Sequence, residues 1–239
     1  MNTDRLSNRL ETVAKYIPAG AKFADIGSDH AYLPCYMLKK QKASFAIAGE
    51  VVDGPFLSAQ KQVVNEGLSD VISVRKGNGL EVINDGEVDC ITIAGMGGSL
   101  IAAILDDGKD KLRSVKRLVL QPNVSAYSIR IWLVENDWSL VTEEIIEEDD
   151  KIYEVLVAEK GEGKKPYSSH IDAELLLGPY LSKEKNQAFQ KKWSIEKANW
   201  ERIIGRLETA NETEETAAKR QELSWKIALV QEVLGNESN

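Results

Sequence analysis

The sequence predicts an α/β protein whose mostly parallel sheet is followed by an all-helical part. Three observations lead to this prediction. Helical and strand patterns alternate from Arg5 to Lys160, and the last two strands of that region follow each other without a helix. Strand signals are almost absent beyond a segment rich in Gly and Lys at 161–166. Alternating strands and helices are typical of a parallel sheet that is covered by helices on both faces.

Apolar residues recur at helical spacing between the expected strands. Leu6, Leu10 and Val13 form the first stripe, and Pro18 ends that helix. Pro34 is expected early in the next helix, where its missing N–H costs little. Later helices of this part are expected at 53–66 and 129–136.

Seven short runs are expected to be strands. Five alternate with helices, at 23–26, 45–50, 71–75, 90–94 and 118–122, and a closing pair follows at 139–146 and 152–158. An acidic turn joins the closing pair, which predicts an antiparallel hairpin at one edge of the sheet. A seven-stranded, mostly parallel sheet of this kind is the class I methyltransferase variant of the Rossmann fold. An NAD-dependent enzyme usually ends with another strand–helix unit instead.

The change of composition predicts two domains, at 1–160 and 161–239. One long helix is expected from Ser182 to Ala210, with Trp193, Trp200 and Leu207 seven residues apart. The segment 211–213 offers a break and a cap.

A second apolar stripe follows that break, with Leu223, Ile227, Val230 and Leu234 at spacings of 4, 3 and 4. Two such helices can pair as an antiparallel hairpin, which predicts a C-terminal α-helical coiled-coil domain. The hairpin either covers an apolar patch of the first domain or also contacts a substrate. Its first helix carries more basic than acidic residues, which favours contact with an anionic substrate.

Charge and cysteine content narrow the class of protein. The 30 Lys and Arg against 38 Asp and Glu argue against nonspecific coating of nucleic acid, although a local basic face is compatible with them. No stretch approaches the roughly 18 apolar residues of a membrane span, and the first residues lack the apolar core of a signal peptide. Cys35 and Cys90 are expected to be buried thiols in a reducing compartment. We therefore expect a cytoplasmic protein with no membrane partner, and we also expect it to be a monomer.

The loop after the first strand reads Asp25-Ile26-Gly27-Ser28-Asp29-His30-Ala31. Gly27 supplies the tight turn that lets the backbone approach a nucleotide-type cofactor. A full dinucleotide fingerprint would have glycines where Asp29 and Ala31 stand, and the Asp29 carboxylate would repel a pyrophosphate at the helix entrance. These departures favour S-adenosylmethionine, which carries an ammonium and a sulfonium, over NAD.

Three further positions follow strands that should end at the same edge of the sheet. Glu50 lies 23 residues beyond Gly27 and is expected to accept hydrogen bonds from ribose hydroxyls, unless it is an ordinary exposed carboxylate. Asn78, followed by Gly79, either fixes the adenine ring or belongs to a plain turn. The run 95–98 offers bare backbone to the cofactor and the target base, with a plain turn as the alternative.

His30 is a candidate metal ligand, because histidine commonly binds metal ions in proteins. The one other histidine is His170, in the helical part, so partner ligands are missing and no metal is expected. A nucleophile elbow of the Gly-x-Ser-x-Gly type is also missing, which argues against a serine hydrolase.

Together these stretches resemble the bacterial tRNA adenine(22)-N1 methyltransferase family. The motifs stand in the family's order and cover roughly residues 5–158: Arg9-Leu10-Glu11, Asp25-Ile26-Gly27-Ser28-Asp29-His30-Ala31-Tyr32-Leu33-Pro34, Gly54-Pro55, Gly77-Asn78-Gly79-Leu80, Ala94-Gly95-Met96-Gly97-Gly98, Gln121-Pro122-Asn123 and Tyr153-Glu154. The resemblance implies methylation of N1 of an adenosine in the D-arm region of tRNA, at position 22, with S-adenosylmethionine as donor and a coiled-coil domain assisting tRNA binding. A methyltransferase for a small molecule or a protein is the alternative.

The expected site follows from these assignments. The cofactor is expected at Gly27, Ser28, Asp29, His30, Glu50, Asn78, Gly79, Ala94, Gly95 and Met96, and the substrate at Arg5, Arg9, Tyr32, Gly97 and Gly98. Asp29 is the catalytic candidate, because a carboxylate stabilises the positive charge that methylation places on adenine. Its alternatives are holding the cofactor's ammonium and capping the next helix.

The substrate residues have their own alternatives. Arg5 and Arg9 are expected on one face of the first helix, where they either hold phosphates or form a solvated face. Tyr32 either stacks on the adenine or belongs to the core.

Overall fold

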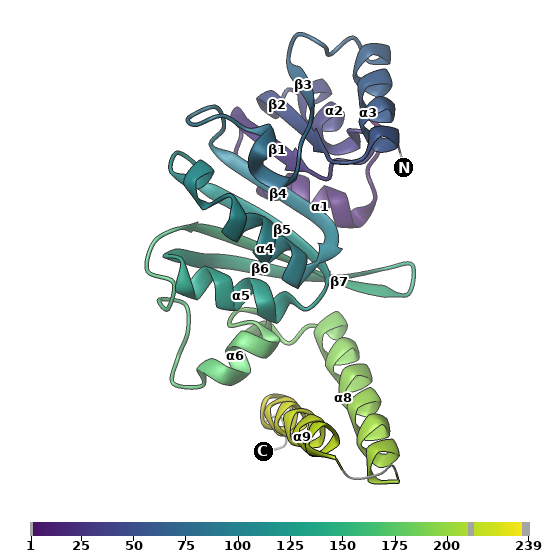
Figure 1. The fold of residues 1–239 in the computed structure, drawn as a ribbon, viewed down its shortest axis with the longest axis vertical. Coiled ribbons are helices and arrows are strands. Elements are labelled where there is room, and N and C mark those ends of the chain that lie inside the picture. The colour runs from purple at the N-terminus through teal and green to yellow at the C-terminus, as the bar shows by residue number, and fades with distance from the viewer. Residues whose placement is uncertain (1, 210–212, 236–239) are drawn as a thin grey trace. The chain divides into compact units, whose positions relative to one another are not determined.

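The computed structural model describes residues 2–209 and 213–235, and its centre is a seven-stranded sheet of order β3-β2-β1-β4-β5-β7-β6 (Figure 1). The strands are β1 Ala21–Ile26, β2 Ala43–Glu50, β3 Ile72–Lys76, β4 Cys90–Gly97, β5 Arg117–Val124, β6 Trp138–Glu148 and β7 Lys151–Lys160. The first five are parallel, and β7 is antiparallel to both β5 and β6. The predicted seven-stranded Rossmann-like methyltransferase fold, with its antiparallel edge, is therefore confirmed.

Helices cover both faces of this sheet. The first unit contains α1 Asn8–Tyr16, α2 Tyr32–Lys39, α3 Asp53–Asn65, α4 Gly98–Asp107, α5 Ala126–Glu135 and the short 3₁₀ turns Gly79–Val82 and Lys109–Leu112. Phe23 of β1 packs in the cluster that holds the buried residues of α1, α2 and α3. Its neighbours Ala24 and Ile26 are also buried but lie outside that cluster. Burial of alternate side chains on both sides of a strand explains the continuous apolar runs in the sequence.

The first helix begins later than the sequence suggested. Ser7 is extended and caps α1, because its side chain accepts a hydrogen bond from the Leu10 N–H. Arg5 and Leu6 therefore precede the helix. The expectation that Arg5 and Arg9 share a helical face is wrong, because the cap turns the chain between them.

A buried ionic cluster fixes the β6–β7 hairpin to α5. The guanidinium of Arg130 is fully buried and lies 2.5 Å from carboxylate oxygens of both Glu143 and Glu154. Glu154 follows Tyr153, so this cluster also anchors the strand that carries the Tyr153 ring.

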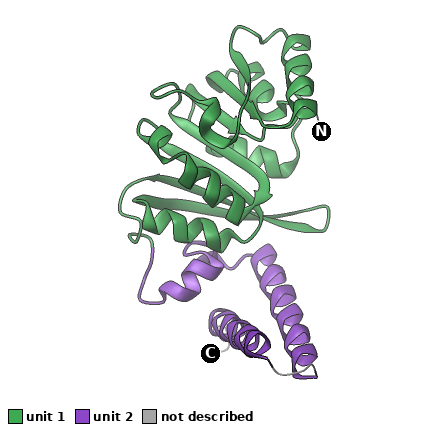
Figure 2. Ribbon diagram, viewed as in Figure 1, with its two compact units in different colours: residues 1–166 green, residues 167–239 purple. Residues whose placement is uncertain are grey.

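The chain divides into two compact units, residues 1–166 and 167–239 (Figure 2). The division falls at the end of the Gly- and Lys-rich segment 161–166, where the sequence predicts the change from one domain to the next. In the described part of the chain, no helix is long and apolar enough to cross a membrane. Both cysteines are buried and unpaired, and burial raises the pKa of the Cys35 thiol to about 12.

The second unit contains α6 Ile171–Leu177, α7 Leu181–Glu184, α8 Gln187–Glu208 and α9 Glu214–Gly235. The single helix expected from Ser182 onward is wrong. Lys185 takes a left-handed conformation with φ 46°, and the Asn186 side chain caps α8 by accepting from the Phe189 N–H. Ala210 and most of the proposed break at 211–213 lie outside the described residues. Helices α8 and α9 pack on each other, and Trp193, Leu223 and Val230 of the two predicted stripes are buried.

Candidate active site

A pocket of about 250 Å³ lies where β1 and β4 end, which is where ligands bind in open α/β sheets. It is lined by Arg9, Leu10, Asp25, Gly27, Ser28, Asp29, Tyr32, Leu33, Ala94, Gly95 and Met96. Eight residues of the expected site thus come together from three separate stretches of sequence. The lining contains two carboxylates and one guanidinium.

The loop between β1 and α2 has an unusual backbone. Gly27 has φ 69°, and the three non-glycine residues Asp29, His30 and Ala31 have φ of 38°, 44° and 53°. Each left-handed non-glycine residue costs on the order of 1 kcal/mol, so the surrounding structure must hold this run in place. Part of that support is visible, since the N–H groups of Gly27 and Ser28 both donate to the Gly49 carbonyl, at 2.9 and 3.2 Å. Strain of this kind is typical of functional sites.

The backbone conformation of Gly27 favours glycine, because its φ is 69°. A Cβ there would lie 2.1 Å from Cε of Met96, the mobile end of a flexible side chain that can move aside. The flexible Met96 side chain therefore crosses directly over the backbone of the loop. This close approach fits the turn that the sequence predicted.

Asp29 does not cap the next helix. The N-cap of α2 is Ala31, and no side chain makes a capping hydrogen bond there. The Asp29 side chain is 70% exposed and lies 3.4 Å from the His30 imidazole. The His30 ring in turn stacks on Tyr32, with centroids 5.4 Å apart. Capping, the structural alternative for Asp29, is therefore excluded, and Tyr32 is a half-buried pocket residue with one ring face against His30.

Glu50 is nearly buried at the end of β2 and touches the same loop. Its Oε1 accepts a hydrogen bond of 2.5 Å from the Asp29 N–H. No hydrogen bond to its Oε2 is made by the residues that the structure describes. Burial is the main cause that raises the pKa of Glu50. The carboxylate is thus held by the loop while one oxygen stays available to a ligand.

Asp25 is a pocket residue to which sequence reasoning assigned no role. Its carboxylate is buried and accepts hydrogen bonds from the hydroxyls of Ser28, at 2.7 Å, and Thr92, at 2.6 Å. Burial raises the pKa of Asp25, and these two hydrogen bonds oppose that rise. Asp25 therefore joins the ends of β1 and β4 to the loop. Its position just before the Gly27 turn is the signal that sequence reasoning could have used.

Two side chains of β5 hold the Gly95 peptide. The Gly95 N–H donates to Oε1 of Gln121 at 3.0 Å, and its carbonyl accepts from Nδ2 of Asn123 at 2.8 Å. Gln121 is fully buried. Gly95 lines the pocket, as expected for a backbone that a ligand can approach, and these two hydrogen bonds hold its peptide in place there. Gln121 and Asn123 belong to one of the motifs that carry the family resemblance, but the sequence alone indicated no role for either residue.

Arg9 is held at the edge of the same pocket by three residues. Glu148 accepts from the Asn8 and Arg9 N–H groups at 2.6 and 3.1 Å, which fixes the first turn of α1. Nη1 of Arg9 donates to Gln121 Oε1 at 2.5 Å, and the guanidinium carbon lies 5.5 Å from the centre of the Tyr153 ring. The side chain is thus half-buried and directed to the pocket rather than displayed on a solvated face.

The other expected residues do not line this pocket. Asn78 is exposed after β3, and its N–H donates to Glu81 within a 3₁₀ turn that Gly79 begins. Gly97 is the N-cap of α4, and Gly98 is packed so closely that a Cβ would lie 2.0 Å from the Ser125 carbonyl. Gly98 therefore has a packing reason to be glycine. Arg5 is exposed, and its N–H donates to the Asn2 side chain.

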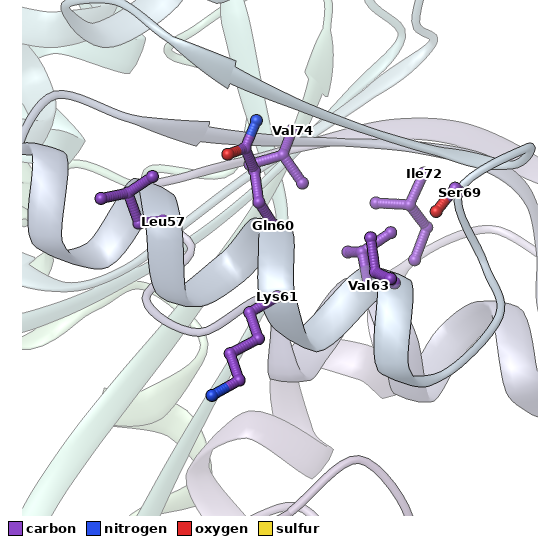
Figure 3. Close-up of a pocket in the computed structure, with 8 residues that line it drawn as sticks. Leu57, Gln60, Lys61, Val63, Ser69, Ile72 and Val74 are labelled. Atoms are coloured by element: carbon purple, nitrogen blue, oxygen red, sulfur yellow. The ribbon is translucent and has the colours of Figure 1, made fainter.

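A larger cavity of about 560 Å³ lies between α3 and β3 (Figure 3). Leu57, Val63, Ile72 and Val74 form its apolar wall, and the Lys61 side chain points away from β3. The cavity is bounded by the sides of a helix and an edge strand rather than by strand ends. It has no carboxylate in its lining and contains none of the expected site residues. Within residues 2–209 and 213–235, no group of three or more His, Cys, Asp or Glu side chains is placed to hold a metal ion.

Known proteins that are similar to this chain in sequence and fold point to the same kind of site. Residues 23–232 match the family model described as tRNA (adenine(22)-N(1))-methyltransferase. The enzyme of that name from Bacillus subtilis (strain 168) is 54% identical over 98% of this chain and 99% of its own. The crystal structure of the B. subtilis m1A22 tRNA methyltransferase covers 96% of this chain and 99% of its own with a TM-score of 0.92.

Relatives have also been solved with cofactor. A putative tRNA (m1A22) methyltransferase from Streptococcus pneumoniae, in complex with S-adenosyl-L-methionine, is 44% identical with a TM-score of 0.82, covering 96% of this chain and 100% of its own. A Mycoplasma capricolum relative, in complex with the cofactor product S-adenosylhomocysteine, is 30% identical with a TM-score of 0.80, covering 95% of this chain and 96% of its own. The chain therefore belongs to the tRNA (adenine(22)-N(1))-methyltransferase family.

Proposed function

We propose that this protein transfers the methyl group of S-adenosylmethionine to N1 of adenosine 22, in the D-arm region of tRNA. The observation that carries the proposal is the pocket at the ends of β1 and β4, formed by the family's motif residues in a chain that matches the family over residues 23–232. We also propose that it acts in the bacterial cytoplasm, where its substrate is found, and as a monomer.

The residues of the pocket fit an S-adenosylmethionine cofactor. Gly27 brings the backbone close to the ligand, and the Met96 side chain lies over the Gly27 backbone. Glu50 has an acceptor oxygen available for the ribose hydroxyls. The guanidinium of Arg9 and the carboxylates of Asp25 and Asp29 complement a ligand end that carries both an ammonium and a carboxylate. The bound cofactor supplies an electrophilic methyl group on its sulfonium.

The chain's own contribution is mainly alignment and electrostatics. N1 of adenine already carries a lone pair, so a strong base is not required for its attack. Methylation leaves a positive charge on the adenine, which the Asp29 carboxylate stabilises from the mouth of the pocket. Because N1 is engaged in base pairing, the adenosine must leave its stack, and the half-buried Tyr32 ring provides a surface for it.

We further propose two domains with separate tasks. The first unit carries the catalytic pocket, and the helical unit assists tRNA binding as a coiled coil. Helix α8 carries five basic and three acidic side chains, whereas α9 carries three basic and four acidic ones. A basic surface for phosphate is therefore expected on α8 rather than on α9.

The test is methylation of a tRNA transcript with labelled cofactor, followed by mapping of the modified base. The expected result is one methyl group at N1 of adenosine 22 and none on a transcript with guanosine at that position. Equal labelling of the two transcripts would contradict the assignment of the target, and labelling of neither would contradict the assignment of the substrate class.

A further inference from the structure

We infer that the side-chain amide of Asn123 recognises the target adenine through its exocyclic amine N6 and its ring nitrogen N7. Asn123 is thereby a specificity-determining residue, with a role beyond the support of Gly95. The inference rests on the proposed function, because it concerns the base that the same pocket receives.

Asn123 stands at the mouth of the pocket. It lies near the end of β5 and is exposed, and its Nδ2 donates to the carbonyl of Gly95 at 2.8 Å. Gly95 lies near the corresponding end of β4 and lines the pocket. A base that enters over these two strand ends therefore passes the Asn123 amide.

The hydrogen bonds of Gln121 and Asn123 fix the direction in which both amides face. Oε1 of Gln121 accepts from the N–H of Gly95 and from Arg9, so its Nε2 is the donor that faces Asn123. A backbone carbonyl can only accept, so the Asn123 atom that meets the Gly95 carbonyl is Nδ2. Oδ1 of Asn123 is therefore a fixed acceptor at the mouth of the pocket.

The Asn123 amide keeps hydrogen-bonding capacity for a ligand. Nδ2 carries two hydrogens, and the Gly95 carbonyl accepts one of them. Among the residues that the structure describes, the donor to Oδ1 is Nε2 of Gln121, at 3.4 Å, which is longer than a normal hydrogen bond of this type. An acceptor and a donor of one planar group thus remain, and asparagine uses this pair to bind N6 and N7 of adenine.

Recognition through N6 and N7 suits the reaction. N1 reacts through its lone pair, so the edge of the base that carries N1 must stay open, and N7 lies on the neighbouring edge. Methylation creates a positive charge that N1 shares with N6, so the hydrogen bond from N6 to Oδ1 of Asn123 strengthens in the transition state. A purine with an oxygen at position 6 would instead place an acceptor against Oδ1, which disfavours it.

The carboxylates of the pocket are less suited to this task. Both oxygens of Asp25 already accept hydrogen bonds from hydroxyl groups. The Asp29 side chain is 70% exposed, and an ionised carboxylate has no donor for N7. Of these three side chains, Asn123 is the one that offers a donor beside its acceptor.

The experiment measures kcat/KM of the full chain on three tRNA transcripts that differ at position 22. They carry adenosine, purine riboside, which lacks the amine N6, or 7-deazaadenosine, which lacks N7. Both analogues keep the lone pair of N1 but change its basicity, so each variant is compared with the wild type on the same transcript.

Asn123→Ala is expected to lower kcat/KM about 10-fold or more for adenosine and at most about threefold for purine riboside, with 7-deazaadenosine in between. Asn123→Asp keeps the acceptor but loses the donor. It should therefore retain the wild-type preference for adenosine over purine riboside and lose its sensitivity to N7.

The matched control is Asn136→Ala, because Nδ2 of Asn136 also donates to a backbone carbonyl, that of Trp132 at 2.7 Å, at the C-terminal end of α5. It should change kcat/KM by the same factor on all three transcripts. The inference is overturned if Asn123→Ala also lowers all three by one factor, since a residue that only supports Gly95 would behave in this way.

It is also overturned if Asp29→Ala removes the preference for adenosine over purine riboside while Asn123→Ala retains it. If Asn123→Ala does not fold, Asn123→Asp decides the question, and an equal loss on all three transcripts again contradicts the inference. The proposed function fails separately, if the wild type does not methylate the adenosine transcript.

Discussion

Replacing Asp29 by asparagine is expected to leave the stability of the fold unchanged and to slow turnover strongly. The structure shows no capping hydrogen bond that the change would remove, and asparagine tolerates the left-handed φ of 38° at least as well as aspartate. Only the contact with His30 at 3.4 Å is weakened, and an exposed pair of this kind contributes about 0–1 kcal/mol. Melting temperatures of the two proteins should therefore agree closely.

The size of the catalytic effect depends on whether the substrate excludes water from Asp29. At a separation of about 4 Å, two unit charges interact by roughly 1 kcal/mol in water and by roughly 4 kcal/mol at an effective dielectric constant of 20. The side chain is 70% exposed in the protein alone, so the lower value would apply if it stayed solvated. We expect tRNA to cover it, which gives an intermediate loss in the rate constant of methyl transfer, on the order of 100-fold.

The assay is single-turnover methylation of tRNA at saturating cofactor, with Asp110→Asn as the control because the Asp110 side chain is 90% exposed near the opposite ends of the strands. The control should behave as wild type. A loss of less than about sixfold in Asp29→Asn would refute the reasoning, because it equals the effect of a fully solvated carboxylate. Catalysis would then rest on positioning of the reactants alone.

Three other predictions follow from particular contacts. Glu50→Ala should weaken S-adenosylmethionine at least tenfold in calorimetry, because each hydrogen bond to its carboxylate contributes about 1.5–3 kcal/mol. Since the pKa of Glu50 is raised and the ionised form is the better acceptor, wild-type affinity should also fall on acidification at a higher pH than for an ordinary glutamate, and a pH-independent affinity would remove Glu50 from the site. Arg130→Met should lower the free energy of unfolding by about 3–5 kcal/mol in urea denaturation, because it leaves Glu143 and Glu154 buried without their cation, and an unchanged midpoint would contradict this. A chain ending at Pro166 should fold and bind cofactor but bind tRNA poorly in a gel shift, whereas tRNA binding equal to that of the full chain would limit the helical unit to a structural role.

Local patterns in the sequence determined the order of the helices and strands and the antiparallel edge of the sheet. Each of these depends on a period of hydrophobic residues that is complete within one segment. The turn at Gly27 was also predictable, because a glycine that directly follows a buried strand marks the place where the chain turns sharply into the next helix. The break before α8 was missed, although Asn186 is a favoured N-cap residue and was available as a signal.

The arrangement of side chains around the pocket was decided only by the tertiary structure. Gln121 and Asn123 hold Gly95 across 26 and 28 positions of the chain, and Arg9 meets Gln121 across 112. No period or local motif encodes such contacts, because they arise where the ends of neighbouring parallel strands meet. The cap at Ser7 likewise separates Arg5 from Arg9, two residues that the sequence spacing placed together. The sequence by itself determined which chemical groups the protein has for its site, and strand packing decided which of them face one another, since the order of strands in a sheet is not their order in the chain.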